Sequence, residues 1–216
     1  MVDMSGEVPM PTPEEIKLYR LYQAGNTSGE VPVQDNRLNI YKYLKELGRP
    51  PKEIAVIMGN IYGESETFDD QEVEKTESED KGQGIFQLTK LKKRVYNKHI
   101  ADKQLPDNYK TQIDFMLDTI YNPDNLSDGI LEVKGMEGKK KHDVSGYGWM
   151  EDLRKSLIED PVDVATKKFT DLWERPKKGH ERYDKRINHA IDIFQNLTGP
   201  RLPRVHGGTM VRNYHE

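Results

Sequence analysis

The sequence contains no cysteine among its 216 residues. Disulfide frameworks and cysteine-based metal sites are therefore excluded. No stretch approaches the ~20 consecutive apolar residues that a membrane-spanning helix requires. Hydrophobic residues make up 34% of the chain and charged residues 32%, and the mean hydropathy is -0.88. So polar a composition predicts one modest core with long solvated edges rather than two full domains.

A surplus of positive charge is also missing. The formal net charge is -4, which argues against a specific nucleic-acid partner. Residues 1–11 have neither a basic region nor an apolar stretch, so we expect no secretory signal. There is no glycine-rich phosphate loop and no Ser-His-Asp arrangement, which leaves amidase or endopeptidase chemistry without support. The histidines show no paired ligand spacing, so we expect no metal and no cofactor; they are His99, His142, His180, His189, His206 and His215.

Apolar residues recur at three- and four-residue spacing through much of the chain, which is typical of amphipathic helices. Glycine and Lys residues dominate residues 133–148, which we expect to be a flexible surface loop. The acidic residues 68–81 lose all periodicity and are also expected to be a loop. The pattern predicts helices over residues 13–24, 36–47, 51–64, 90–100, 107–121, 161–173 and 183–197.

Glu64 is the most informative single residue. The predicted helix that begins at Pro51 has its apolar face at Ile54, Ile57 and Ile61, and Glu64 extends that face by three residues. A carboxyl group on an apolar face, at the negative end of a helix dipole, holds its proton more readily than one in water. Cleavage of a glycosidic bond needs such a proton donor. The alternative from periodicity alone is that Glu64 follows the last turn and faces solvent.

A second informative segment begins nineteen residues after Glu64 and reads Gln83-Gly84-Ile85-Phe86-Gln87-Leu88-Thr89. Glycines around a short apolar run predict a small strand or hairpin and allow a backbone to approach an extended polymer closely. The Gln87 amide can donate to and accept from sugar amides and hydroxyls. Thr89 also suits the cap of the following helix.

Together the two segments resemble the lysozyme superfamily, namely goose-type lysozymes, soluble lytic transglycosylases and, most closely, phage tail lysozymes. Those enzymes pair a helix-ending Glu-Ser-x-x-Phe with a downstream Gly-x-x-Gln strand. Glu64, Ser65 and Phe68 match the first pattern, and Gly84 and Gln87 match the second. The phrases with the closest likeness to the phage tail group are Gly59-Asn60-Ile61-Tyr62 and Trp173-Glu174-Arg175-Pro176.

The resemblance implies a mainly α fold of the α+β lysozyme type, a helical body with a small β-hairpin beside the catalytic helix. It implies that Glu64 is the general acid of a peptidoglycan glycosidase that cleaves the β-1,4 MurNAc-GlcNAc bond. The residues expected to bind substrate or orient the acid are Ser65, Gly84, Phe86, Gln87 and Thr89. Glu174, in its Glu-Arg-Pro stretch, is interpreted as part of a structural corner, and Trp173 as core.

Whether the reaction is hydrolysis or transglycosylation stays open at this point. A hydrolase usually needs a second carboxylate, and Asp80 and Glu79 are the best-placed candidates, ahead of Asp69 and Asp70. A run this acidic is equally compatible with plain solvated surface. A lytic transglycosylase needs no such partner and gives 1,6-anhydro products. Two alternatives are not enzymes. The chain could be a catalytically silent virion protein with a lysozyme fold, or a module that only binds glycan.

The resemblance also implies a setting. We expect a phage virion component that is delivered into the host periplasm or cell envelope and opens peptidoglycan locally for DNA passage. The expected organisation is an N-terminal arm with a short helix over residues 1–33, a catalytic domain over 34–199 and a C-terminal tail over 200–216. The arm and the tail would bind other virion proteins, and the catalytic domain would bind glycan strands.

Overall fold

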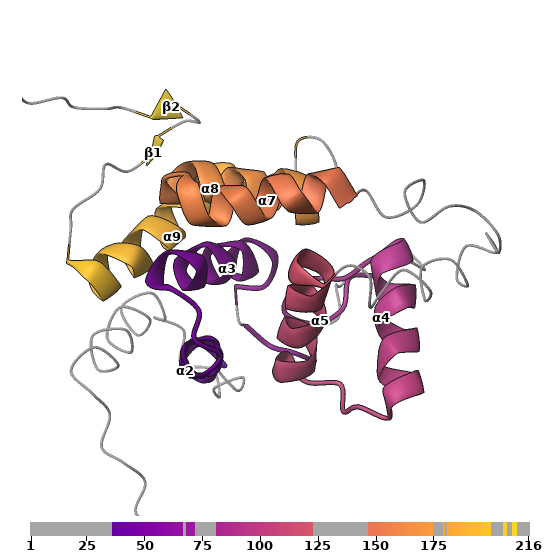
Figure 1. The fold of residues 1–216 in the computed structure, drawn as a ribbon. Coiled ribbons are helices and arrows are strands. Elements are labelled where there is room, and N and C mark those ends of the chain that lie inside the picture. Colours follow the sequence, from indigo (N-terminus) through magenta and orange to yellow (C-terminus); the bar gives the residue numbers. More distant parts are fainter. Residues whose placement is uncertain are drawn as a thin grey trace, which may run out of the picture.

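The computed structural model describes residues 36–66, 68–71, 81–122, 147–174, 179 and 181–199, together with the backbone of 205–206 and 209–210. In these ranges the protein is mainly helical, as the sequence predicts (Figure 1). The elements are α2 (Arg37–Glu46), α3 (Pro51–Glu64), α4 (Lys90–Lys103), α5 (Tyr109–Tyr121), α7 (Tyr147–Glu159), α8 (Val162–Phe169), η2 (Thr170–Glu174), α9 (Tyr183–Thr198), β1 (Val205–His206) and β2 (Thr209–Met210).

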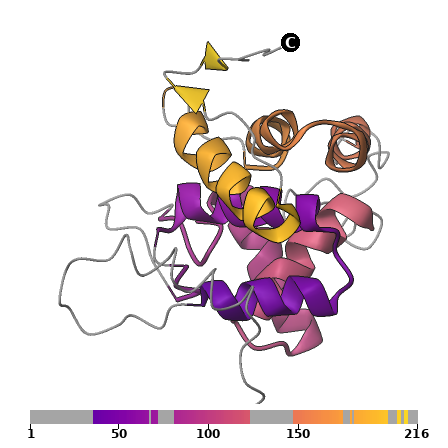
Figure 2. The ribbon, with the colours of Figure 1, turned by 90° about the vertical axis from the view of Figure 1, so that its left-hand side faces the viewer.

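Helix α3 lies at the centre of the described fold and contacts α2, α7, α8 and α9 (Figures 1 and 2). Its predicted apolar face is buried, because Ile54, Ile57 and Ile61 are at most 3% exposed. Small residues bring α9 close: a Cβ added to Gly59 would lie 2.7 Å from the Ala190 Cβ. Burial on nearly every side holds the end of α3 in a fixed position relative to α8, η2 and α9.

Helix termini follow the local sequence. Pro51 is the first residue of α3, where its fixed φ suits a helix and its missing N–H costs nothing. The Asn108 side chain caps α5 by accepting from the Thr111 N–H at 3.1 Å. At the other end of α3, Ser65 takes an extended conformation with φ -127°, and the helix stops.

Residues 82–89 form a tight turn where the sequence predicts a hairpin. Gln83 and Leu88 exchange two backbone hydrogen bonds, of 3.2 and 2.9 Å, around the turn. Gly84 has φ +72° and Gln87 has φ +45°, so two residues in the left-handed region reverse the chain within four positions. Among the described residues, the expected pair of strands beside α3 is not seen at this turn, which leads directly into α4. The described strand pair is the two-residue β1–β2 ladder, in which Val205 opposes Met210.

One further helix was not predicted. α7 begins at Tyr147, within the segment expected to be loop, and buries Met150, Leu153 and Leu157. α7 and α8 form a layer over α3 in Figure 1, and α8 runs directly into the π-helical segment η2. The predicted helix over 13–24, the loop residues 133–146 and the greater part of the arm and the tail lie outside the described residues.

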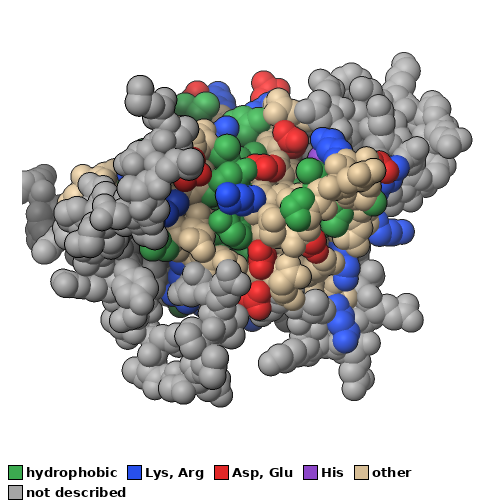
Figure 3. Space-filling model, turned by 90° about the horizontal axis from the view of Figure 1, so that it is seen from below, with side chains coloured by type: hydrophobic (Ala, Val, Ile, Leu, Met, Phe, Trp, Pro, Cys, Tyr) green, Lys and Arg blue, Asp and Glu red, His purple; other side chains and the backbone are tan. Residues whose placement is uncertain are grey.

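The described surface is mixed in charge. On the face in Figure 3, acidic and basic side chains are interspersed with hydrophobic ones, and neither sign forms a continuous field. Within the described ranges, no helix is both long enough and apolar enough to span a membrane.

Candidate active site

Glu64 is the last residue of α3, and its carboxylate forms an ion pair with the Arg186 guanidinium of α9. The Glu64 side chain is 20% exposed, whereas that of Arg186 is 1% exposed. Glu64 thus neither faces open solvent nor sits among apolar side chains alone. A buried cation fixes the orientation of the carboxylate, while part of the side chain remains accessible.

Arg186 is held by a set of backbone and side-chain acceptors. Its Nε donates to the Glu181 carbonyl at 2.8 Å, and its Nη1 donates to the Asn60 carbonyl at 3.0 Å and to the Asn60 Oδ1 at 3.3 Å. Gly63 makes room for this side chain, because a Cβ there would lie 2.4 Å from the Arg186 Cγ. Burying an arginine is costly unless its donors are paired, and here Nε and both terminal nitrogens have partners.

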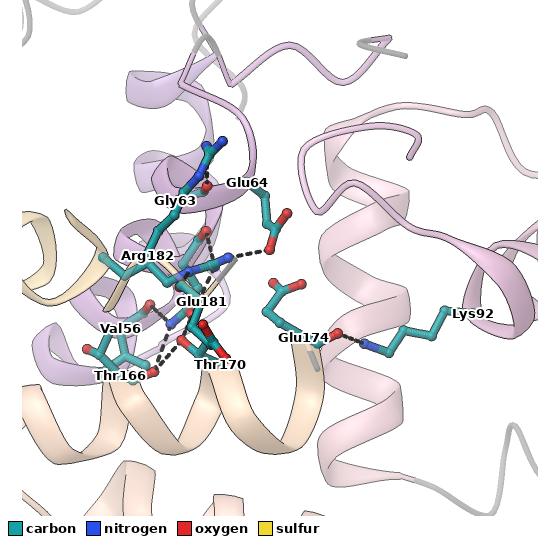
Figure 4. A network of polar contacts seen from close by, with 11 residues as sticks. Val56, Gly63, Glu64, Lys92, Thr166, Thr170, Glu174, Glu181 and Arg182 are labelled. Atoms are coloured by element: carbon teal, nitrogen blue, oxygen red, sulfur yellow. Dashed lines mark hydrogen bonds and ion pairs between the residues drawn. The ribbon is translucent and has the colours of Figure 1, made fainter. Parts of the chain in front are cut away.

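Asn60 joins this network to the segment that follows α8. The Thr170 Oγ1 donates to the Asn60 Oδ1 at 2.7 Å, and the Asn60 Nδ2 donates to the Val56 carbonyl at 2.9 Å. Both Asn60 and Thr170 are fully buried. α3, η2 and α9 are therefore connected by one buried polar network that ends at Glu64 (Figure 4).

Glu174 supplies a second carboxyl group at the same place. It ends η2, a π-helical turn of the type that often marks functional sites. In Figure 4 the side chains of Glu64 and Glu174 point toward one another. The Glu174 Oε1 is buried and has no hydrogen-bond partner among the described residues. Burial raises the pKa of Glu174 to about 8, and the negative charge of Glu64 contributes to the rise.

Lys92 and Arg186 are the positive charges that oppose this rise in the pKa of Glu174. The Lys92 Nζ donates to the Glu174 backbone carbonyl at 3.1 Å and lies 4.3 Å from the centroid of the Trp173 ring. The Lys92 side chain therefore contacts the end of η2 at two points, the Glu174 backbone carbonyl and the Trp173 ring. Trp173 is fully buried, as its interpretation as core requires.

Sequence reasoning missed Glu174, which it interpreted as part of a structural corner. The residues Arg175 and Pro176 that complete that stretch lie outside the described part. The available signal is a glutamate directly after a buried aromatic residue at the end of an apolar helix face. Glu64 likewise stands at the end of an apolar helix face, that of α3, although the residue before it is Gly63.

The residues predicted to bind substrate differ in their exposure, and two of them, Ser65 and Phe86, have buried side chains. Ser65 is fully buried, and its backbone carbonyl accepts from the Phe68 N–H at 3.2 Å, which turns the chain after α3. Phe86 is buried and packs edge-to-face on Trp173, with ring centroids 4.9 Å apart. The turn over residues 82–89 therefore meets the end of η2 through the core, because Phe86 packs on the residue that precedes Glu174.

The other predicted substrate residues belong to the turn over residues 82–89. Gly84 leaves space for Gln112, whose Oε1 accepts from the Ile85 N–H at 2.9 Å and anchors the turn on α5. The Gln87 Nε2 donates to the Gly84 carbonyl at 2.9 Å, so the amide folds back on its own turn. Thr89 is exposed at the N-cap of α4, and its side chain makes no cap hydrogen bond. Of these residues, Thr89 and the partly exposed Gln87 reach the surface.

The second carboxylates proposed from sequence, Glu79 and Asp80, lie outside the described residues. Asp70 accepts from the Tyr109 N–H at 2.7 Å and so joins this segment to the start of α5, whereas Asp69 accepts from the Gln71 N–H at 2.9 Å and stabilises a local turn. In the described part of the chain no three His, Asp or Glu side chains are grouped to hold a metal ion.

The close packing of the Arg186 side chain against Gly63 of α3 leads to a first prediction. We expect Gly63→Ala to lower the free energy of unfolding by about 1–3 kcal/mol, because the new methyl group overlaps the Arg186 side chain. Chemical denaturation measures the change. In an Arg186→Ala background the overlapping atoms are gone, and the same substitution should cost nothing. An equal penalty in both backgrounds would show that the contact with Arg186 is not its cause.

Comparison with known proteins gives one match. The family model described as phage tail lysozyme matches residues 35–197, more than half of the chain. A search of curated proteins and a search of solved structures each found no match. The matched range contains Glu64, Glu174 and Arg186.

Proposed function

Because the chain belongs to the phage tail lysozyme family, a lysozyme-like group that acts on peptidoglycan, we propose that it cleaves the β-1,4 bond between MurNAc and GlcNAc, with Glu64 as the catalytic acid. The observation that carries the proposal is the position of Glu64. Its carboxyl group is partly accessible at the end of a buried helix, is oriented by Arg186, and faces a second carboxyl group.

This arrangement supports glycosidic cleavage chemically. The leaving oxygen must take up a proton as the bond breaks, and the sugar ring develops positive charge. A carboxyl group fixed by a buried guanidinium cannot swing away from the bond, so it is positioned before substrate arrives. Once deprotonated, the same carboxylate is stabilised by its ion pair and lies close to the developing charge.

The proposed setting is a phage virion. The enzyme would be carried in the particle and act in the host cell envelope, where it opens peptidoglycan locally. Residues 1–33 and 200–216 would bind neighbouring virion proteins and leave the catalytic body accessible to glycan. The family name supports the association with phage, and the partners are part of the proposal.

Mass spectrometry of purified peptidoglycan digested with the full chain tests this function. We expect soluble muropeptides that end in reducing MurNAc. Ends of the 1,6-anhydro type would identify a lytic transglycosylase instead. Absence of released sugar would contradict the enzyme proposal; the chain would then be a binding module if it still sediments with peptidoglycan, and a silent structural protein if it does not.

A further inference from the structure

We infer that Glu64 and Glu174 share a single proton in the resting protein, and that Glu174 is the positioning residue that keeps this proton available to Glu64. The inference rests on the proposed function for its catalytic consequence. The sharing of the proton itself is a property of the folded chain and can be measured without substrate.

The geometry of Glu174 requires a partner for its buried oxygen. The Glu174 Oε1 has no donor among the described residues, and a buried carboxylate oxygen without a donor is costly. The group that Glu174 faces is the carboxyl group of Glu64 (Figure 4). Two carboxylates that face one another repel, whereas one proton between them converts the repulsion into a hydrogen bond.

The cations around Glu174 do not supply the hydrogen bond that its carboxyl group lacks. The described groups that face Glu174 are Glu64 from α3, Lys92 from α4 and Arg186 from α9. The terminal nitrogens of Arg186 bind Glu64 and Asn60, and its Nε binds the Glu181 carbonyl. The Lys92 Nζ binds the Glu174 backbone carbonyl rather than its carboxyl group. Burial and the charge of Glu64 therefore outweigh the two cations, in agreement with the raised pKa of Glu174.

A shared proton resolves how Glu64 can be both paired with Arg186 and an acid. In a coupled pair the proton belongs to both groups and is found on either of them. When the bond between the anomeric carbon and the glycosidic oxygen breaks, its electron pair goes to the oxygen, and Glu64 gives that oxygen the proton. Both carboxylates are then ionised, beside Arg186 and Lys92.

The second half of the reaction restores the pair. A hydroxyl group adds to the anomeric carbon, from water in hydrolysis or from the same sugar in transglycosylation. It loses its proton to Glu64 or Glu174, and one proton is again shared. Atoms and charge balance in either case, so the inference does not depend on which product forms.

The pH profile of Glu174→Gln in the full chain tests the inference. The neutral amide can donate to Glu64 but carries no transferable proton, so Glu64 loses the neighbour that keeps a proton available to it. We expect the rate of sugar release near pH 7 to fall by about 10²-fold, a smaller loss near pH 5, and therefore a lower pH optimum. Glu174→Asp keeps an ionisable group and should retain the wild-type pH profile.

Glu66→Gln is the matched control. Glu66 lies two residues after Glu64, its side chain is 59% exposed, and it pairs with Lys185. The same change of chemical group there should leave the pH profile as in the wild type. A Glu174→Gln protein that folds and shows the wild-type profile would overturn the inference, because a structural role alone predicts a uniform loss at every pH.

Stability against pH provides a test without substrate. The pKa of Glu174 is raised from its ordinary 4.5 to about 8 by folding, so its stabilising contribution is complete below about pH 4.5 and is lost as pH rises to about 8. The unfolding free energy of the wild type should fall over that interval relative to Glu174→Gln. Parallel curves would overturn the inference even if the wild type is active. An inactive wild type with the expected difference would refute the proposed function alone.

If Glu174→Gln does not fold, Glu64→Gln gives the same information. Without the charge of Glu64 the pKa of Glu174 falls, so the loss of stability should begin at lower pH than in the wild type. An unchanged pH dependence of unfolding in Glu64→Gln would overturn the shared proton.

Discussion

Glu64→Gln is expected to reduce the release of soluble sugar from peptidoglycan by about 10²–10⁴-fold, the range over which general acids contribute to catalysis. The amide cannot give a proton to the glycosidic oxygen. Its carbonyl oxygen can still accept from the Arg186 Nη2, so the network around Asn60 and the end of α3 should persist. The loss is therefore expected in the rate of cleavage and not in the fold.

Muropeptide release and turbidity clearing measure this effect, and circular dichroism with thermal unfolding checks the fold. Glu66→Gln serves again as the control, because it is the same substitution at an exposed position in the same turn. A Glu64→Gln protein that clears peptidoglycan at the wild-type rate would remove Glu64 from the mechanism and the proposed site with it.

Arg186→Met is expected to lower the free energy of unfolding by about 3–5 kcal/mol, the cost of breaking a buried ion pair by removal of one partner. Methionine fills most of the volume but offers no donor. The Asn60 carbonyl, the Glu181 carbonyl and the Glu64 carboxylate would each lose a hydrogen bond. For a chain of this size the corresponding fall in Tm is roughly 6–20 °C.

Arg182→Met is the matched control for this prediction. Arg182 is exposed at the N-cap of α9, and its Nη1 donates to the Gly63 carbonyl at a longer 3.3 Å. Its loss should change the free energy of unfolding by about 0.5 kcal/mol or less, as for most surface substitutions. If both variants unfold alike in chemical denaturation, the buried network contributes little to stability.

Most of the helical body could be predicted from the sequence, because long amphipathic segments carry their own periodicity. The apolar positions of α3 predicted its buried face, and Pro51 predicted its start. α7 was missed although Met150, Leu153 and Leu157 follow helical spacing, since the glycine- and Lys-rich residues 133–148 made the region resemble a continuous loop. The expected hairpin is not shown among the described residues, where the turn over residues 82–89 leads directly into α4 at Lys90 and leaves no room for a second strand.

The candidate site was predictable only in part. Glu64 could be found because its place on a helix face is a local property. Its contact with Arg186 spans 122 positions, and nothing in the spacing of α9 indicates which polar residue points inward. The structure explains the glycine at position 63, because any larger side chain there would overlap Arg186. The sequence alone gives no reason for a glycine at this position. The roles of Ser65, Phe86, Gln87 and Thr89 toward substrate stay predictions.

Because η2 is a π-helical turn, the number of residues between Thr170 and Glu174 decides the direction in which the Glu174 side chain points. A π turn holds about one residue more than an α turn, so the loss of a single residue within it would let the segment relax into a continuous α-helix. Each residue of an α-helix turns roughly 100° about the axis. Glu174 would then rotate off the side that meets α3, together with its neighbour Trp173, while Thr170 at the start of the turn kept its place. Homologous chains that differ in length by one residue here would accordingly differ in whether two acidic groups meet at the end of α3.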